Sequence, residues 1–351
     1  INTGGFFKMI TQKFVYKIIA SKPIKRLALE EIRSIYIASL KMAPSPIKVI
    51  GKDTILLELP FYAGLEIARR ASFIKYAGIL LDDKSLQLLP NLHFKSISGI
   101  PNSFALRTMH DLALKDLQEE GTLGRIFKAL KSSHTVNLRN PYYEIDVLYI
   151  EDSPFLSLRL PIGRLNTLHR DPLYKPFAPP ATMDSILSRA LVNLSRINIG
   201  DIFLDPFCGS GSLLIEAYFI GAFPIGIEIH PKNAYGAIFN TNFVHSEINI
   251  IIGDATNMPF PDQTIDGIAT DPPYGRSAST FKLTISRLYQ GFLEEAFRVL
   301  KKGKYLTMCY PPILTKHISN VINKIGFHEI FNCKLFVHKG LTRLISVLFV
   351  P

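Results

Sequence analysis

The chain has 351 residues, of which 47% are hydrophobic and 20% are charged. This length exceeds one ordinary core and predicts two or three domains, and the composition excludes a disordered chain. The net charge of +11 favours a polyanionic partner such as nucleic acid, because each Lys or Arg near a phosphate releases counterions. A solvated basic surface is the plain alternative for that charge.

Three cysteines, Cys208, Cys309 and Cys333, stand far apart in the sequence without any CxxC pair. This spacing argues against a zinc site or a disulfide framework, and we expect no metal and a reducing cytoplasm. The most apolar window, residues 213–229, contains Glu216 and Glu228 and is a poor membrane span. Residues 1–8 show no signal-peptide pattern, and Met9 is a candidate native start.

The first half of the chain mixes helical and strand-like patterns. The pattern predicts a small α+β domain over residues 1–95, a second small domain over 96–165, and an Arg-, His- and Pro-rich linker over 166–181. The expected strands are 14–19, two short stretches within 48–59, 104–108, 143–149 and 155–160. The expected helices are 28–40, 65–81 and 122–130.

From Thr182 onward the pattern changes, and Thr182 is the expected N-cap of a helix that includes residues 186–194. Short apolar runs then alternate with helical patterns, which predicts a doubly wound, mostly parallel sheet in a domain over residues 182–351. The expected strands are 202–205, 224–228, 248–252, 265–270 and 305–309, with a closing hairpin from 330–337 and 343–350.

Four acidic residues follow strands of this domain: Asp205, Glu228, Asp254 and Asp271. Ligands of an open α/β sheet bind beyond the carboxyl ends of its strands, so we expect these acids to line one pocket. Glu228 lies about 20 residues beyond a glycine turn, the spacing at which a carboxylate takes ribose hydroxyls. Asp254 is placed to accept a hydrogen bond from an adenine amino group.

The glycine turn, Gly209-Ser210-Gly211, lets the backbone approach a ligand before a helix that begins near Ser212. A dinucleotide enzyme would carry a third glycine where Leu214 stands. The acidic surroundings suit a cationic sulfonium and its ammonium better than a diphosphate. The alternative for this motif is a tight turn that binds no ligand, and the alternative for each acid is that it caps a helix.

The segment Asp271-Pro272-Pro273-Tyr274 is the candidate catalytic loop. An exocyclic base amine is a poor nucleophile, and acceptors such as the Asp271 carboxylate and the Pro272 carbonyl can return electron density to its nitrogen. Two prolines stiffen the loop, and the Tyr274 ring offers a face on which an extruded base can stack. No cysteine lies beside the loop, so a cysteine nucleophile is not indicated.

Residues 205–217 (DPFCGSGSLLIEA) and 271–277 (DPPYGRS) resemble the amino-methyltransferase motifs of the archaeal THUMP-domain tRNA (guanosine-10 N2) methyltransferases. Residues 188–197 and 338–343 are similar to further parts of that family. The N-terminal half resembles its ferredoxin-like and THUMP modules, and residues 136–141 are the most THUMP-like piece. The sequence departs from the family at residues 170–177, and at Ser210 and Ser212 in the glycine turn.

The resemblance implies a Rossmann-like class I methyltransferase domain with a mostly parallel seven-stranded sheet, preceded by ferredoxin-like (1–95) and THUMP (96–165) domains. It implies S-adenosyl-L-methionine as the cofactor, a cytoplasmic location and a monomer that binds tRNA, with a small zinc-ribbon activator as a further candidate partner. The implied cofactor-binding residues are Thr182, Asp205, Phe207, Cys208, Gly209, Gly211, Glu228, Ile229, Asp254, Ala255 and Asp271, and the catalytic residues are Asp271, Pro272, Pro273 and Tyr274. Candidate RNA contacts are Arg125, Lys128, Lys131, Arg139, Arg159, Arg164, Arg170 and Arg276.

The leading hypothesis is therefore methylation of a tRNA guanosine at N2, at guanosine 10. The same chemistry at another tRNA position or on ribosomal RNA is the nearest alternative. A DNA amino methyltransferase and a non-catalytic RNA-binding protein that keeps the fold are the other two. The intact acids argue against the last of these, and the sequence leaves open whether one or two methyl groups are added.

Overall fold

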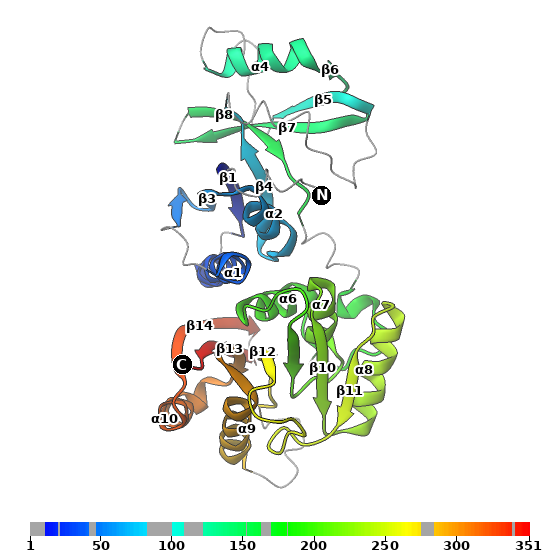
Figure 1. Cartoon of the computed structure of the whole chain (residues 1–351), viewed down its shortest axis with the longest axis vertical. Coiled ribbons are helices and arrows are strands. Elements are labelled where there is room, and N and C mark those ends of the chain that lie inside the picture. The colour runs from blue at the N-terminus through cyan, green and yellow to red at the C-terminus, as the bar shows by residue number, and fades with distance from the viewer. Residues whose placement is uncertain are drawn as a thin grey trace. The chain divides into compact units, whose positions relative to one another are not determined.

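The computed structural model describes residues 11–19, 22–41, 47–82, 100–108, 122–151, 153–162, 170–180, 182–274, 284–338 and 341–351. The chain forms two compact units (Figure 1). Unit 1 comprises residues 1–20, 45–69 and 74–162, and unit 2 comprises residues 21–44, 70–73 and 163–351.

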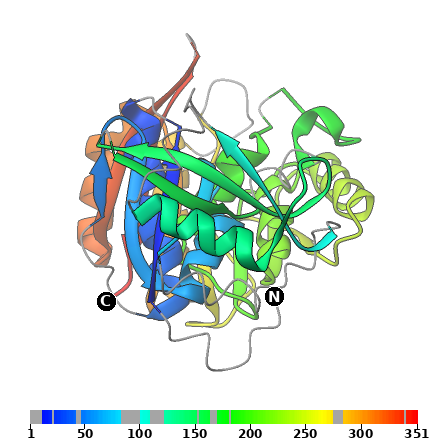
Figure 2. The same ribbon diagram turned by 90° about the horizontal axis from the view of Figure 1, so that it is seen from above.

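Unit 1 is built on one eight-stranded sheet in the order β2-β3-β1-β4-β8-β7-β5-β6. Its elements are β1 (Thr11–Ile18), β2 (Lys48–Ile50), β3 (Thr54–Pro60), α2 (Phe61–Arg70), β4 (Ile74–Leu80), β5 (Ile100–Thr108), α4 (Thr122–Ser133), β6 (Thr135–Val136), β7 (Pro141–Ile150) and β8 (Ser153–Arg159). β4 pairs antiparallel with β8, so strands from both predicted N-terminal domains join in one sheet. Helix α4 packs on β8 (Figure 2).

The expected helix over residues 65–81 is wrong. α2 ends at Arg70, and Ile74–Leu80 forms β4, which lies between β1 and β8 in the middle of the sheet. Six of its seven residues are buried, so the sequence shows a continuous apolar run without the alternation of a half-exposed strand. Periodicity cannot separate such a run from a buried helix, and strand pairing decides its structure.

Unit 2 contains a seven-stranded sheet in the order β11-β10-β9-β12-β13-β15-β14. The strands are β9 (Ile202–Asp205), β10 (Phe223–Glu228), β11 (Asn249–Ile252), β12 (Ile265–Thr270), β13 (Leu300–Tyr310), β14 (His328–His338) and β15 (Leu341–Phe349). The helical elements are α1 (Lys22–Leu40), η5 (Pro172–Tyr174), α6 (Ser185–Leu194), α7 (Ser212–Ile220), α8 (Pro231–Phe243), α9 (Ile285–Val299), η6 (Pro312–Leu314) and α10 (Thr315–Ile325). β9 to β13 pair in parallel, and β15 runs antiparallel to both β13 and β14, which confirms the predicted sheet and hairpin.

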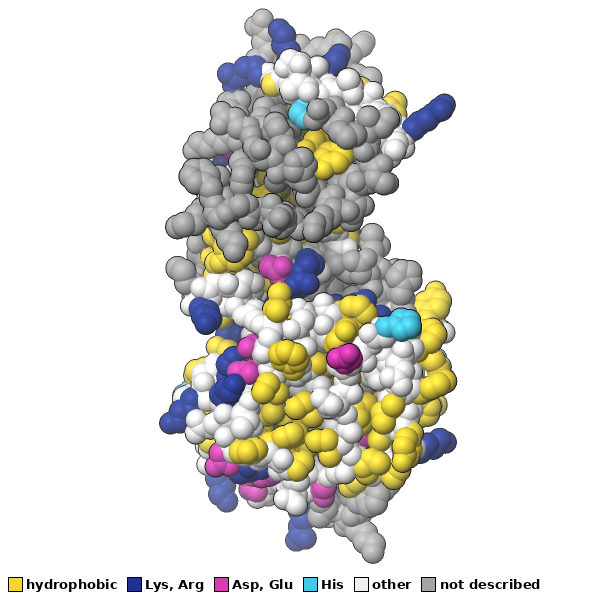
Figure 3. Space-filling model, turned by 45° about the vertical axis from the view of Figure 1, so that its right-hand side comes forward, with side chains coloured by type: hydrophobic (Ala, Val, Ile, Leu, Met, Phe, Trp, Pro, Cys, Tyr) yellow, Lys and Arg dark blue, Asp and Glu magenta, His cyan; other side chains and the backbone are white. Residues whose placement is uncertain are grey.

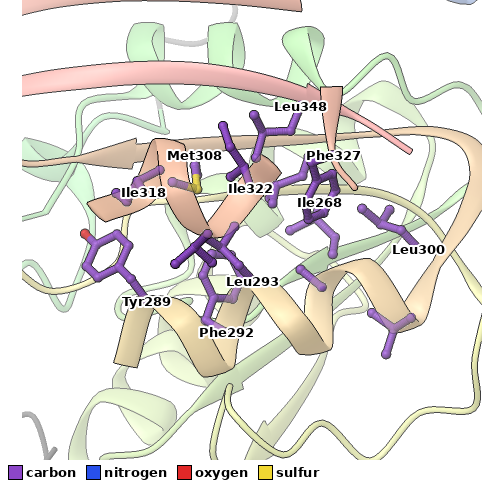
Figure 4. Close-up of a cluster of buried hydrophobic side chains, with 14 of the residues drawn as sticks. Ile268, Tyr289, Phe292, Leu293, Leu300, Met308, Ile318, Ile322, Phe327 and Leu348 are labelled. Carbon is purple, nitrogen blue, oxygen red and sulfur yellow. The ribbon is translucent and has the colours of Figure 1, made fainter. Parts of the chain in front are cut away.

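The hydrophobic core of unit 2 includes the side chains between α9, α10 and the sheet (Figure 4). Tyr289, Phe292 and Leu293 of α9 are fully buried and belong to the same cluster as Ile318 of α10 and Met308 of β13. Thr284 caps the helix by accepting a bond from the Arg287 amide. The Tyr289 hydroxyl also lies 3.5 Å from the carbonyl oxygen of Pro272, so α9 contacts the segment that follows β12.

Helix α1 belongs to unit 2 although it lies near the start of the sequence. The buried Glu31 carboxylate accepts hydrogen bonds from the Ser72 amide (2.9 Å), the Ser72 hydroxyl (2.8 Å) and the Asn193 side-chain amide (2.8 Å). Burial raises the pKa of Glu31, and these donors oppose the shift. The predicted domain boundaries at residues 95, 165 and 181 stay predictions.

The predicted N-cap at Thr182 is wrong. α6 begins at Ser185, and the Asp184 carboxylate caps it by accepting a bond from the Leu187 amide at 2.8 Å. Both side chains are typical caps, so the sequence alone could not select between two residues only two positions apart. No helix in the described ranges is long and apolar enough to cross a membrane.

Candidate active site

A cavity of about 570 Å³ lies in unit 2 at the carboxyl ends of β9, β10, β11 and β12. Parallel strands bring their carboxyl ends to one edge of the sheet, which is why acids distant in sequence meet there. The cavity is lined by Pro179, Thr182, Met183, Asp205, Pro206, Phe207, Cys208, Gly209, Ser210, Ser212, Leu213, Glu228, Ile229, His230, Asn233, Gly253, Asp254, Ala255, Thr256, Asp271, Pro273 and Leu288.

The glycine turn connects β9 to α7, and both glycines need their special conformation. Gly209 has φ +51° and Gly211 has φ +80°, in the left-handed region that glycine adopts without strain. The Gly209 amide donates to the Glu228 carboxylate (3.0 Å), and the Gly211 amide donates to the Cys208 carbonyl (2.7 Å). These two N–H groups have partners within the protein, so they are not free to bind a phosphate.

The four acids have different surroundings. The Glu228 carboxylate also accepts from the His230 amide (2.8 Å), and the Asp254 carboxylate accepts from the amide and hydroxyl of Thr256 (2.8 and 2.9 Å). These bonds fix Glu228 and Asp254 in the lining of the cavity, and each carboxylate keeps further acceptor capacity.

Asp205 is the most enclosed of the acids, with 1% of its surface exposed. Its Oδ1 accepts from the Thr270 hydroxyl (2.7 Å) and the Phe207 amide (3.2 Å). Burial raises the pKa of Asp205 to about 7, and the negative charges of Asp271 and Glu228 add to the shift. The ionised form of Asp205 is therefore unfavourable in the empty site, and a cation bound nearby would stabilise it.

The lining suits a cationic ligand that also carries polar groups. Four carboxylates contribute to it, and no Lys or Arg occurs among the described residues that line the cavity. A sulfonium with an ammonium group gains from this charge, whereas a diphosphate would be repelled. The residues present therefore fit S-adenosylmethionine.

The predicted linker forms part of this site, which the sequence did not reveal. Arg170 makes a two-pronged ion pair with the buried Glu216 (2.8 and 3.0 Å), and the Lys175 ammonium donates to the Ser212 hydroxyl (2.7 Å). The Asn240 side chain bonds both the amide and the carbonyl of Phe177 (2.9 and 2.7 Å). These contacts hold residues 170–180 against α7 and α8, and they account for the unusual segment 170–177.

The candidate catalytic loop follows β12 directly. Asp271 and Pro273 line the cavity, and the Tyr274 hydroxyl donates to Asp271 Oδ1 at 2.7 Å. The guanidinium of Arg343 on β15 donates to Asp271 Oδ2 through Nε (3.1 Å) and Nη2 (2.9 Å). Burial and the Asp271 charge raise the pKa of Tyr274 well above its usual value, so this hydroxyl stays a donor.

Cysteine chemistry is disfavoured at this site. Cys208 lines the cavity, and Cys309 lies buried on β13. Burial raises the pKa of both thiols well above the usual range, and nearby acidic charges add to the effect. A thiol that stays protonated is a poor nucleophile.

The structure brings most of the predicted cofactor residues together. All of them except Gly211 line the cavity, and Gly211 instead shapes the turn behind it. Pro272 and Tyr274 are not part of the lining. Lining residues that sequence reasoning missed include His230, Asn233 and Thr256, which carry no motif of their own.

The candidate RNA contacts fall outside the cavity. Arg125, Lys128 and Lys131 are exposed on α4, and Arg139 is exposed between β6 and β7. Arg164 and Arg276 lie outside the described residues. Arg159 is paired with Glu144 and Asp146. The expectation for Arg170 is wrong, because its side chain is buried in an ion pair with Glu216. In the part of the chain that the structure describes, no group of His, Cys, Asp and Glu has the arrangement of a metal site.

The sheet order, the acid-lined cavity and the glycine turn define unit 2 as a methyltransferase domain of the S-adenosylmethionine-dependent class. An RMKL-like methyltransferase domain family matches residues 172–323. TrmN from Thermus thermophilus has the same fold, with a TM-score of 0.50 at 18% identity over 97% of this chain and 100% of that protein.

Two archaeal relatives narrow the class to a family. The tRNA (guanine(10)-N2)-dimethyltransferase of Methanothermobacter thermautotrophicus is 34% identical over 65% of this chain and 67% of its own length. The enzyme of the same name from Pyrococcus abyssi is 32% identical over 81% of this chain and 86% of its own length. The chain belongs to the family of archaeal tRNA (guanine(10)-N2)-dimethyltransferases.

Proposed function

We propose that the protein transfers a methyl group from S-adenosylmethionine to the exocyclic N2 amine of guanosine 10 in tRNA. The observation that carries the proposal is the position of Asp271, whose carboxylate borders an acid-lined cavity and is fixed by Tyr274 and Arg343. The names of its relatives support the choice of guanosine 10 and of two successive methylations.

In this proposal each of the acids around the cavity contacts a different part of the cofactor. Asp205 would balance its positive charge, Glu228 would accept hydrogen bonds from the ribose hydroxyls, and Asp254 would accept a hydrogen bond from the adenine amine. When bound, S-adenosylmethionine supplies a methyl group on a positively charged sulfur.

The catalytic loop acts on the target amine. Asp271 and the carbonyl of Pro272 accept hydrogen bonds from its N–H groups and so return lone-pair density to nitrogen. The N–C bond would form there as the bond from the methyl carbon to sulfur breaks, which leaves a neutral thioether, and the proton that nitrogen loses would pass to Asp271 or to solvent. The Tyr289 hydroxyl lies 3.5 Å from the Pro272 carbonyl oxygen and helps to hold it. Because these acceptors are fixed before the reaction, little reorganisation accompanies it. The target base has to leave its stack to reach the loop, and Tyr274 offers it an aromatic face.

Unit 1 is the proposed tRNA-binding part of the chain, with THUMP-like residues in its second half. Three basic side chains are exposed on α4, namely Arg125, Lys128 and Lys131, and Arg139 is exposed nearby in sequence. Such residues contact phosphates without reading bases. Arg164 and Arg276 remain candidates of the same kind.

We also propose a cytoplasmic monomer with a small zinc-ribbon protein as activator. An apolar surface on unit 2 supports a protein partner: Tyr235, Phe239 and Phe243 are more than half exposed on one side of α8. Hydrophobic side chains are frequent on the face that Figure 3 presents. The assay below, run with and without a zinc-ribbon protein and combined with light scattering, tests this part.

The deciding experiment is a radiolabelled methyl assay on an unmodified tRNA transcript. We expect N2-methylated guanosine at position 10 from the natural transcript and no label from a transcript with inosine at that position, which lacks the N2 amine. Asp271→Ala should abolish transfer while tRNA affinity stays within a few fold. Label on the inosine transcript, or full activity of the variant, would contradict the proposal.

A further inference from the structure

A buried arginine from the last strand contacts the carboxylate of the catalytic loop. Arg343 has 6% of its surface exposed and lies 72 positions beyond Asp271 in the sequence. β15 is antiparallel to β13, so it begins at the edge of the sheet where β12 ends. This topology is what brings Arg343 to the site.

The two donors of Arg343 occupy one side of the carboxylate. Nε and Nη2 both bond Oδ2, at 3.1 and 2.9 Å, while the Tyr274 hydroxyl bonds Oδ1 at 2.7 Å. A carboxylate offers about four lone-pair directions, two on each oxygen. Three of these lone-pair directions are therefore filled. The remaining one is on Oδ1 of Asp271, whose side chain borders the cavity.

The orientation of an aspartate carboxyl needs such outside contacts, because the torsion about its last bond has a broad energy minimum. Charge-assisted bonds from a guanidinium are shorter and stronger than neutral ones, and two of them to one oxygen restrict rotation. Tyr274 alone supplies one bond and leaves the carboxyl free to turn about it.

We propose that Arg343 is a positioning residue for methyl transfer, which holds Asp271 so that Oδ1 presents its free lone pair to the amine. This inference rests on the proposed function. Arg343 touches neither target base nor cofactor in this scheme and acts through Asp271. The competing explanation is that the ion pair between Arg343 and Asp271 only stabilises the fold. Loss of Arg343 should lower kcat of the folded protein if it positions Asp271, and should leave that kcat unchanged if it only stabilises the fold.

The first test compares Arg343→Lys and Arg343→Gln with wild type. We expect kcat to fall roughly 100-fold in Arg343→Gln, since a group that orients a transition-state contact is lost. KM for tRNA and Kd for S-adenosylmethionine should stay within about threefold. Arg343→Lys keeps the charge without the two-pronged geometry, so its kcat should lie between those of wild type and Arg343→Gln. Tens of millimolar guanidinium should partly restore the kcat of Arg343→Gln.

Arg70→Gln is the matched control. Arg70 is also buried in unit 2, and its guanidinium donates to the side chains of Asn193 and Asn198 and to the Ile197 carbonyl, which all lie outside the catalytic loop. Its loss should lower the melting temperature without changing kcat of the folded fraction, and added guanidinium should not raise its activity.

The second test is a double-mutant cycle with Asp271→Asn, which keeps the shape of the side chain and removes its charge. If Arg343 acts through Asp271, adding Arg343→Gln to Asp271→Asn should cost less than about a further threefold in kcat. Independent, multiplying losses would overturn the inference, as would wild-type kcat in Arg343→Gln.

Should Arg343→Gln fail to fold, Arg343→Lys decides: unchanged kcat refutes the inference, and a lowered kcat with an unchanged melting temperature supports it. A wild-type chain that is inactive on tRNA even with the zinc-ribbon protein present overturns the proposed function, whereas an active wild type with an unaffected Arg343→Lys overturns the positioning role alone.

Discussion

Lowering the pH should weaken cofactor binding through Asp205. This carboxyl is 1% exposed, and its pKa of about 7 means that in the empty site it is largely protonated below neutrality. A cationic ligand binds the ionised form. The ionised fraction rises from about one tenth at pH 6 to about three quarters at pH 7.5, so the affinity should rise about eightfold.

Isothermal titration calorimetry with S-adenosylmethionine between those two pH values measures this change in affinity. The same titrations in buffers of different ionisation enthalpy measure the protons released on binding. Asp205→Asn keeps an oxygen for Thr270 and Phe207 and should give a weaker, pH-independent affinity. His230 also borders the cavity, and His230→Asn serves as the control that retains the pH dependence. Pronounced pH dependence in Asp205→Asn, or none in wild type, would refute the assignment.

Three further predictions follow from the same geometry. Without ligand, the Asp205 pKa lies above its unfolded value, so this group should lower the free energy of unfolding as the pH rises from about 4 to 7, and urea titrations should show a smaller slope in Asp205→Asn than in wild type. Glu228→Ala removes the acceptor for the Gly209 and His230 amides and should raise Kd for the cofactor about 10- to 100-fold by calorimetry, with tRNA binding unchanged. Phe292→Ala should lower the free energy of unfolding by about 3–5 kcal/mol in the same titrations, because the ring is fully buried in the core of unit 2.

The central strands of unit 2 could be predicted almost residue by residue. The runs 202–205 and 265–270 coincide with β9 and β12, and 224–228 differs from β10 by one residue. Strands covered by helices on both faces are short apolar runs that end in polar residues, and these runs are too short for a buried helix. The acids that follow these strands met at one edge for the same reason.

The contacts between distant segments could not be predicted. Arg343 reaches Asp271 only because β15 turns back beside β13, and a single arginine in a sequence does not carry that information. Asn240 likewise gives no signal on α8, yet it bonds Phe177 and also the Ser210 carbonyl at 2.9 Å. Residues 170–180 lack periodicity because side-chain bonds to unit 2 hold them, and an absence of pattern is typical of a linker too.

The two aspartates that follow β9 and β12 illustrate how environment separates similar residues into different tasks. Asp271 has a buried guanidinium as a permanent partner, whereas Asp205 is paired with no cation among the described residues. The negative charge of Asp271 disfavours ionisation of Asp205. Ionisation of Asp205 therefore becomes favourable when a positively charged ligand binds beside it. Asp205 is thereby suited to sensing the cofactor, and Asp271, whose counter-charge is built in, is suited to holding one orientation whether or not the cofactor is bound.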